Sequence, residues 1–363
     1  MVSVVKSISP LAFPFKCMDP FLFCVFHLDN YPAGNAENMF APRRGNGADF
    51  DWSQPYRMYH GERLPGFPQH PHRGFETLTL VQEGTCDHTD SLGAAGRYGG
   101  NGRAGDLQWM TAGRGVVHGE NFPLRFTDRP NTLHLFQIWL NLPAKSKMAA
   151  PCYKMTWAES MPFVQGENGA ECEVAAGQLG SVRAACPPPP DSWASEPDSD
   201  VGVFYITLPP RGGRFVLPAA THGAAINRSA FVVQAPHLGI DGATSGPSRI
   251  SAGGRELPEG GRATLTLRAE LECEFLNEHA SEAAHVLVLQ GRPIGEPVAQ
   301  QGPFVMNTQQ EIRQAFADYQ RTQFGGWPWE EDAVVFPRHQ SRFADYVAPD
   351  GNKVRDLPPA SKE

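Results

Sequence analysis

The 363-residue chain has 31 Lys and Arg residues against 39 Asp and Glu residues, a formal net charge of −8. This acidic balance argues against direct binding of nucleic acid, because a phosphate-binding surface needs an excess of basic side chains. The length favours two domains, and no apolar run is long enough to cross a membrane, so we expect no membrane partner.

Turn-forming residues are abundant, with 37 Gly and 33 Pro. Such an excess favours many turns between short strands, so the sequence predicts an all-β fold of the sandwich or barrel type. The seven Cys residues are scattered and form no CxxC pair, a pattern typical of reduced thiols. The sequence therefore predicts a cytoplasmic or nuclear protein.

The first 17 residues contain two Lys and no acidic residue. The segment is short and poor in Arg for a transit peptide, and Pro10 and Pro14 interrupt it. We expect no targeting segment there, although the sequence leaves organelle targeting open.

The tripeptide His70-Pro71-His72 is the first segment with side chains that could bind a metal ion. Residues i and i+2 of a strand point to the same face, so His70 and His72 can bind one cation without backbone strain. The signal is weak alone, because a chain with 12 His residues contains about 0.4 such pairs by chance. Residues 77–81 (TLTLV), which follow, predict a strand because they are apolar or β-branched.

The tripeptide His118-Gly119-Glu120 places an imidazole and a carboxylate at the same spacing. Two neighbouring antiparallel strands, each with one such pair, would supply four ligands to one ion. Three imidazoles and one carboxylate suit Fe(II), Mn(II), Cu(II), Ni(II) or Zn(II) rather than Ca²⁺ or Mg²⁺. An octahedral ion would keep two positions open for water, O₂ or a bidentate substrate.

The tripeptide His60-Gly61-Glu62 repeats this pattern, and spacing alone does not exclude it. We favour a surface loop for it, between Tyr59 and Pro65. The remaining histidines have no HxH partner, and no ligand role is predicted for His27, His88, His134, His222, His237, His279, His285 or His339.

Further short strands are expected at residues 134–140, 204–208, 215–217, 231–233, 263–267 and 286–289. A low-complexity segment separates the expected strand at 134–140 from the later ones. In it, Cys186 precedes four consecutive prolines and a stretch rich in Ser and acidic residues. A proline run favours extended chain, so we place a linker at 166–200.

One helix is predicted near the C-terminus, beginning at an N-cap at Asn307 or Thr308 and ending at Gly325-Gly326. Ile312, Phe316 and Tyr319 would lie on one face of it. The polar residues 331–363 are expected to form a tail.

The stretch from Gly66 to Thr77 resembles the first cupin motif, and the stretch from Gly105 to Glu120 resembles the second. Together, HPHRGFET and GDLQWMTAGRG followed by HxE resemble the pirin family. Shorter stretches also resemble this family: Asp19-Pro20-Phe21, Asn141 to Lys145, Gly302 to Asn307 and Phe324 to Pro328. The resemblance covers about residues 18–330.

This resemblance implies a bicupin, with two cupin-type β-barrels, a short C-terminal helix and iron in the first barrel alone. The family's ligands fall on His70, His72, His118 and Glu120. The expected domains are an N-terminal metal-binding cupin at 18–165, the linker at 166–200 and a C-terminal metal-free cupin at 201–330. A polar tail at 331–363 would follow.

Pirins are described as quercetin 2,3-dioxygenases, so the resemblance implies an Fe(2+) enzyme that acts on a flat aromatic flavonol with O₂. Glu120 would take the flavonol hydroxyl proton as a general base. Glu76 and Gln108 would orient the histidines or serve as ordinary polar strand residues. Phe67, Phe75 and Trp109 would stack on the ligand or fill the core.

Pirin relatives are also described as nuclear cofactors of transcription factors. The alternative function is therefore an iron-dependent redox sensor that binds a protein partner. A third hypothesis is an ion with a mainly structural role. Sequence alone does not decide between them, since fold and family do not fix function. We expect a monomer.

Overall fold

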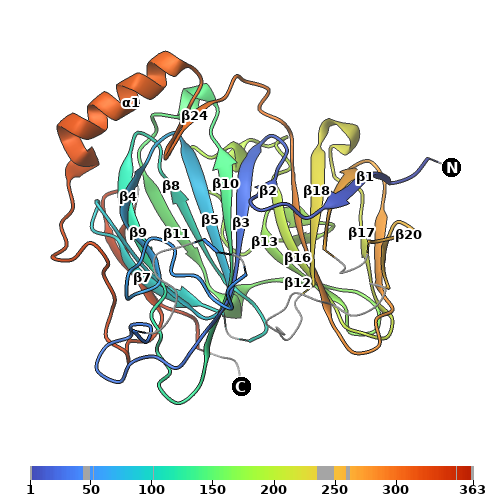
Figure 1. The fold of residues 1–363 in the computed structure, drawn as a ribbon. Helices are drawn as coiled ribbons and strands as arrows, with labels where there is room; N and C mark the ends of the chain where they lie inside the picture. The colour runs from blue at the N-terminus through green and yellow to red at the C-terminus, as the bar shows by residue number, and fades with distance from the viewer. Residues whose placement is uncertain are drawn as a thin grey trace. The chain divides into compact units, whose positions relative to one another are not determined.

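The computed structural model describes residues 2–43, 50–51, 53–100, 102–234, 249–258, 262–348 and 350–360. These residues form many β-strands and one α-helix, so the predicted all-β fold with a short C-terminal helix is confirmed (Figure 1). The chain divides into two compact units. We call residues 26–160 and 296–363 the histidine unit, and residues 1–25 and 161–295 the apolar unit.

Two sheets of antiparallel strands form the histidine unit. One has the order β11 (Cys152–Thr156), β8 (Asp106–Thr111), β5 (Phe75–Glu83), β10 (Asn131–Asn141) and β3 (Phe21–Tyr31). The other has the order β27 (Lys353–Asp356), β26 (Phe343–Val347), β7 (Ala95–Gly99), β6 (Thr85–Asp90), β9 (Val116–Asn121) and β4 (Gly66–His72). Their buried residues include Tyr31, Val81, Tyr98, Leu135 and Tyr153, which form a shared core.

The helix of the histidine unit, α1 (Gln309–Thr322), follows the short hairpin of β24 (Ala299–Gln301) and β25 (Phe304–Met306). Thr308 is its N-cap and forms a capping box with Glu311. Ile312 is buried against the hairpin. With 14 residues, α1 is too short and too polar to cross a bilayer, and the described residues contain no other α-helix.

The apolar unit has a seven-stranded sheet in the order β1 (Val5–Pro10), β21 (Ala263–Arg268), β18 (Asn227–Gln234), β23 (Ala284–Gly291), β16 (Gly202–Leu208), β13 (Glu171–Ala176) and β12 (Phe163–Gln165). A second sheet has the order β17 (Gly213–Leu217), β22 (Cys273–Asn277), β19 (Ile250–Ala252) and β20 (Arg255–Glu256). Alternate residues of these strands, such as Phe204, Phe215, Leu265 and Phe275, form its core.

Shorter elements complete both units. The apolar unit also has the hairpin of β14 (Gln178–Leu179) and β15 (Val182–Arg183), and β2 (Phe15–Lys16) pairs with the first half of β3. Single 3₁₀ turns lie at Ala144–Ser146, Ala158–Ser160, Trp193–Ser195, Gly223–Ala225 and Gln323–Gly325. Each strand expected from the sequence lies within a strand of the structure.

The two units differ from the ranges expected from the sequence. The range expected as a linker, 166–200, contains β13, which pairs with β12 and β16. The proline run is irregular, but it follows this strand rather than replacing it. The helix and the residues after it, expected at 201–330, belong to the histidine unit.

The range expected as a polar tail, 331–363, contains β26 and β27, and β26 pairs with β7. The reason lies in a buried ion pair: Arg97 contacts Asp87 at 2.6 Å, and both side chains are fully buried. Arg97 also donates to the carbonyl oxygens of Phe336, Pro337 and Gln340. The polar C-terminal segment therefore supplies acceptors that a buried guanidinium requires.

This packing predicts that a chain ending after Glu330 is destabilised. Arg97 would lose three carbonyl acceptors, and we expect the free energy of unfolding of the histidine unit to fall by about 3 kcal/mol or more. Urea unfolding followed by far-UV circular dichroism measures this loss. A chain ending after Leu357 keeps both strands and serves as the control. Equal stability of the two shortened chains would contradict the structural role of this segment.

Candidate metal centre

Three histidines converge where β4 and β9 pair. The strands are antiparallel, and His70 lies directly opposite His118. One ligand atom from each of His70, His72 and His118 lies within 4.8 Å of the other two. The ring centroid of His70 is 4.4 Å from that of His118 and 4.7 Å from that of His72. The two tripeptides thus lie on neighbouring antiparallel strands, as their spacing predicts.

Hydrogen bonds orient two of the rings. Nδ1 of His70 lies 2.8 Å from the carbonyl oxygen of Pro68, and Nδ1 of His72 lies 3.4 Å from that of Pro303. An imidazole that donates from Nδ1 has its lone pair on Nε2, the atom then available to a metal. His118 is fully buried, and neither of its nitrogens has a hydrogen-bond partner in the described chain.

Burial keeps these imidazoles neutral. Desolvation lowers the pKa of His70 to about 4, and the hydrogen bond to Pro68 offsets part of this effect. Desolvation also lowers the pKa of His72 and His118 well below the usual value, and the neighbouring imidazoles add to the shift. A neutral imidazole is the form that binds a metal, so at neutral pH these rings are ready to act as ligands.

Glu120, the fourth expected ligand, lies in a network of neutral donors. Tyr98 Oη donates to its Oε1 at 3.1 Å, and Thr79 Oγ1 donates to the same atom at 3.0 Å. Gln137 Nε2 donates to Oε2. Its carboxylate lies within 4.8 Å of ligand atoms of His118 and of a further histidine, His88. The four expected ligands therefore fall into two overlapping groups that share His118.

His88 was missed by the sequence reasoning. It lies on β6, directly opposite Glu120 on β9, and it is fully buried. The search for HxH pairs passed over it. The signal available was the alternation His88-Thr89-Asp90, which places a second imidazole and carboxylate on one face of a strand.

Among the other residues considered from the sequence, Glu76 accepts a hydrogen bond from Thr111 at 2.6 Å. Gln108 contacts Thr79, a donor to Glu120, at 3.5 Å. The predicted role of these two residues in orienting the histidines stays a prediction.

An aromatic pair borders His72. Phe75 stacks on Trp139 with the ring centroids 3.9 Å apart, and the Trp139 centroid lies 5.2 Å from that of His72. Phe67 lies on the other side, with its ring centroid 6.2 Å from that of His70. Trp139 is the aromatic neighbour that the sequence reasoning did not name.

The C-terminal segment of the histidine unit contacts the strand that carries the HxH pair. Gln69 donates from its backbone and side chain to the carbonyl and side-chain oxygens of Asp332. Arg73, which follows His72, forms a 2.8 Å ion pair with Asp318 on α1. Contacts on both sides of His70 and His72 therefore hold this edge strand in place.

The competing tripeptide lies outside the cluster, although the ring centroid of His60 is 5.5 Å from that of Phe67. His60 and Glu62 are exposed in the loop before β4, between Tyr59 and Pro65. Neither belongs to a cluster of potential ligands in the described residues.

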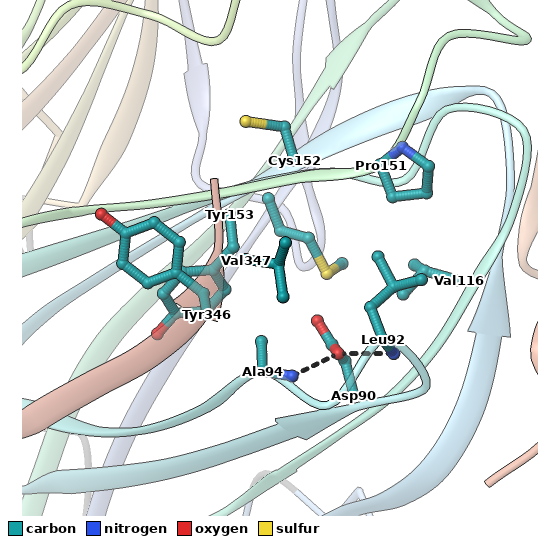
Figure 2. A pocket seen from close by; sticks show the side chains of 10 residues that line it. Asp90, Leu92, Ala94, Val116, Pro151, Cys152, Tyr153, Tyr346 and Val347 are labelled. Carbon is teal, nitrogen blue, oxygen red and sulfur yellow. Dashed lines mark hydrogen bonds between the residues drawn. The ribbon is translucent and has the colours of Figure 1, made fainter. Parts of the chain in front are cut away.

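A small pocket lies beside His88. Figure 2 shows Asp90, Leu92, Ala94 and Tyr153 among its lining residues. Asp90 Oδ1 accepts hydrogen bonds from the backbone N–H groups of Leu92 and Ala94, drawn as dashed lines, and so fixes the turn after β6. The ring centroid of Tyr153 lies 5.1 Å from that of His88. The far end of the candidate centre is thus bounded by one acid and one aromatic ring.

The side chains described above fit a transition-metal ion. Buried imidazoles without hydrogen-bond partners are costly unless a cation accepts their lone pairs. The donor set of nitrogen and carboxylate oxygen suits borderline divalent ions.

Comparisons with known proteins show the family of this chain. The Pirin family model matches residues 42–140, and the model of the Pirin C-terminal cupin domain matches residues 248–325. A pirin-like protein of Caulobacter vibrioides is 36% identical over 262 residues, which are 72% of this chain and 81% of that protein. The chain belongs to the pirin family.

Two further relatives have similar sequence identity to this chain. Pirin-1 of Arabidopsis thaliana is 34% identical over 265 residues, 72% of this chain and 78% of that protein. A Pseudomonas aeruginosa protein named "Putative quercetin 2,3-dioxygenase" is 35% identical over 262 residues, 70% of this chain and 79% of that protein.

Among solved structures, a quercetin 2,3-dioxygenase from Acinetobacter baumannii has a TM-score of 0.64 and 24% sequence identity to this pirin-family protein. The match covers 90% of this chain and 99% of that chain. It shows the shared fold, two cupin-type β-barrels.

The geometry predicts that His118 is needed for metal binding, because it belongs to both groups of potential ligands. We expect His118→Ala to reduce the metal bound after purification and reloading to less than about a tenth of the wild-type amount. Elemental analysis by mass spectrometry measures it. His60→Ala, which removes an exposed histidine of the same tripeptide type, should bind metal as the wild type does. The assignment would be contradicted if both variants lost the same amount of bound metal, or if neither lost any.

Proposed function

We propose that this protein is a metal-dependent dioxygenase of flavonols, with His70, His72, His118 and Glu120 as ligands of Fe(II). The observation that carries the proposal is the cluster of three neutral imidazoles, with His72 and His118 buried and His70 half-buried, whose ligand atoms lie within 4.8 Å of one another. Two of them direct Nε2 away from a backbone acceptor, and the third has no protein partner in the described chain. Relatives named as quercetin 2,3-dioxygenases support the choice of reaction.

An ion held by His70, His72, His118 and Glu120 would supply Lewis acidity and a template for a flavonol and O₂. The donor set supports a divalent transition metal, and we propose iron among such metals because of the resemblance to pirins. An ion with these four ligands would keep positions open if it were octahedral, unlike a purely structural site, in which protein ligands close the coordination sphere.

Glu120 is the candidate proton acceptor. Its Oε1 accepts from Tyr98 and its Oε2 from Gln137, while the single hydroxyl proton of Thr79 is shared between Glu120 Oε1 at 3.0 Å and Gln137 Oε1 at 2.7 Å. A carboxylate oxygen with a spare lone pair is the better base, so Oε2 would take the proton of a flavonol hydroxyl. The donors on Oε1 would keep the carboxylate in one orientation during the transfer.

Trp139 and Phe75 form the aromatic side of the centre. Their stacked rings lie next to His72, Phe75 is fully buried, and Trp139 keeps about 9% of its surface exposed. A flat flavonol placed against the exposed part of Trp139 would displace water from the metal ligands and gain ring contacts. This arrangement favours an aromatic substrate over a sugar or a peptide.

The proposal predicts that Glu120→Gln abolishes turnover while the metal remains bound. The three imidazoles are unchanged, but the amide cannot accept the proton, so O₂ uptake with quercetin should fall about 100-fold or more. An oxygen electrode, with iron content measured in the same samples, separates the two effects. Glu62→Gln, at the exposed copy of the tripeptide, is the matched control. Equal O₂ uptake by the Glu120→Gln variant and the wild type would sink the proposal, as would no uptake by either.

The regulatory alternative, an iron redox sensor for a transcription factor, stays a prediction, as does the monomeric state. A difference in partner capture between ferrous and ferric protein would support the regulatory role, and identical capture would count against it.

A further inference from the structure

We propose that His88 is an additional ligand of the metal centre, which gives the ion a second position formed by His88, His118 and Glu120. We call this the β6 position, and the site of His70, His72 and His118 the β4 position. The inference rests on the proposed metal site and deepens it.

Strand order places the two positions side by side. In the sheet, β9 lies between β4 and β6. Residues directly opposite in an antiparallel pair project to the same face, and so do residues i and i+2 of a strand. His70 lies opposite His118 from one side of β9, and His88 lies opposite Glu120 from the other. The tripeptide on β9 therefore has imidazole neighbours on both strands.

His88 has no partner that would explain its burial. Its side chain is fully buried, and neither Nδ1 nor Nε2 has a hydrogen-bond partner in the described residues. The nearest acid, Asp90, places Oδ2 3.7 Å from Nε2, beyond hydrogen-bond distance. Its other oxygen, Oδ1, accepts from the turn amides in Figure 2. A buried imidazole with two unsatisfied nitrogens costs stability unless something binds it.

Distances support a cation as that missing partner. Single ligand atoms of His88, His118 and Glu120 lie within 4.8 Å of one another, as do those of the β4 position. The ring centroids of His88 and His118 are 5.3 Å apart. Two imidazoles and one carboxylate form a donor set that suits a divalent transition metal with open positions.

Sharing His118 has a consequence for occupancy. Because both positions draw on this one side chain, we expect one ion, with His88 and Glu120 as its ligands when it occupies the β6 position. Among the described residues, the β4 group includes no carboxylate, so Glu120 would have to turn toward this position to complete the four ligands proposed above. A flavonol or other chelating ligand next to Trp139, which borders His72, would meet the ion at the β4 position.

The test removes the β4 position and asks whether metal binding survives. Purified full-length protein stripped of metal is titrated with Co(II), followed by visible absorption and by competition with a chelator. We expect the His70→Ala/His72→Ala double variant to retain one Co(II) equivalent, with affinity reduced by about 10- to 1000-fold. Adding His88→Gln to the double variant should lower the affinity at least about 100-fold further.

A matched control uses a buried histidine of the same unit outside the cluster. His134 lies on β10, packed against Phe26 and Phe136. Adding His134→Gln to the double variant should leave Co(II) binding unchanged. Circular dichroism of each metal-free variant identifies chains that do not fold.

A second measurement does not depend on the double variant. In the otherwise wild-type chain, His88→Gln at saturating Co(II) should change the intensity of the visible bands, because one nitrogen ligand is lost. A folded double variant that binds no Co(II), or an unchanged spectrum in the His88→Gln single variant, overturns the inference. If wild-type protein binds Co(II) but its iron form consumes no O₂ with quercetin, the proposed reaction is wrong. The β6 position is tested independently of this result, by the Co(II) titrations.

Discussion

The register of β9 between its two neighbours is the constraint on which this centre depends. Side chains alternate between the two faces of a strand. The observed register of β9 therefore brings His118 and Glu120 to the face that His70 and His88 share. A slip by one residue would turn both β9 side chains to the opposite face. The centre is therefore a property of strand pairing, and each ligand lies on a β-strand rather than on a loop, although the register of β4 against β9 shifts between Phe67 and His70. Such a scaffold fixes ligand positions more closely than loops do.

The histidine unit is arranged so that the imidazoles have few partners other than a metal. Burial lowers the pKa of His72 and His118, while backbone carbonyls occupy Nδ1 of His70 and His72. Both effects leave neutral nitrogen lone pairs, and in the described chain no protein group satisfies those of His118. The cost of leaving them unsatisfied in the free protein becomes part of the driving force for binding a cation.

The sequence predicted those parts of the structure that follow from side-chain periodicity. The HxH and HxE tripeptides, read as strands, gave the pairing of β4 with β9, and the capping residues gave α1. The role of the C-terminal segment could not be found in this way. Its contacts to Arg97 and His72 use backbone carbonyls, which every residue type offers, so no sequence pattern marks them.

His88 illustrates a different limit of prediction from short sequence motifs. Its spacing to Asp90 is the same as that within the recognised tripeptides, but Asp90 turns one oxygen to the amides that follow and does not join the cluster. What makes His88 a candidate ligand is the neighbouring strand, since its partner Glu120 is 32 positions away in the chain and adjacent in the sheet. Non-local pairing of this kind is invisible to any search for short motifs.

The surroundings of Glu120 separate its role from that of the histidines. Three neutral donors satisfy the carboxylate without a metal, whereas His118 and His88 have no donor or acceptor in the described chain. An ion that recruits Glu120 competes with hydrogen bonds already made, but an ion that recruits the imidazoles competes with none. Affinity for the metal should therefore reside mainly in the histidines, and the carboxylate remains available for proton transfer. A carboxylate that moves between its donors, an ion and a proton can serve more than one step of a reaction, provided that the imidazoles keep the ion in the barrel.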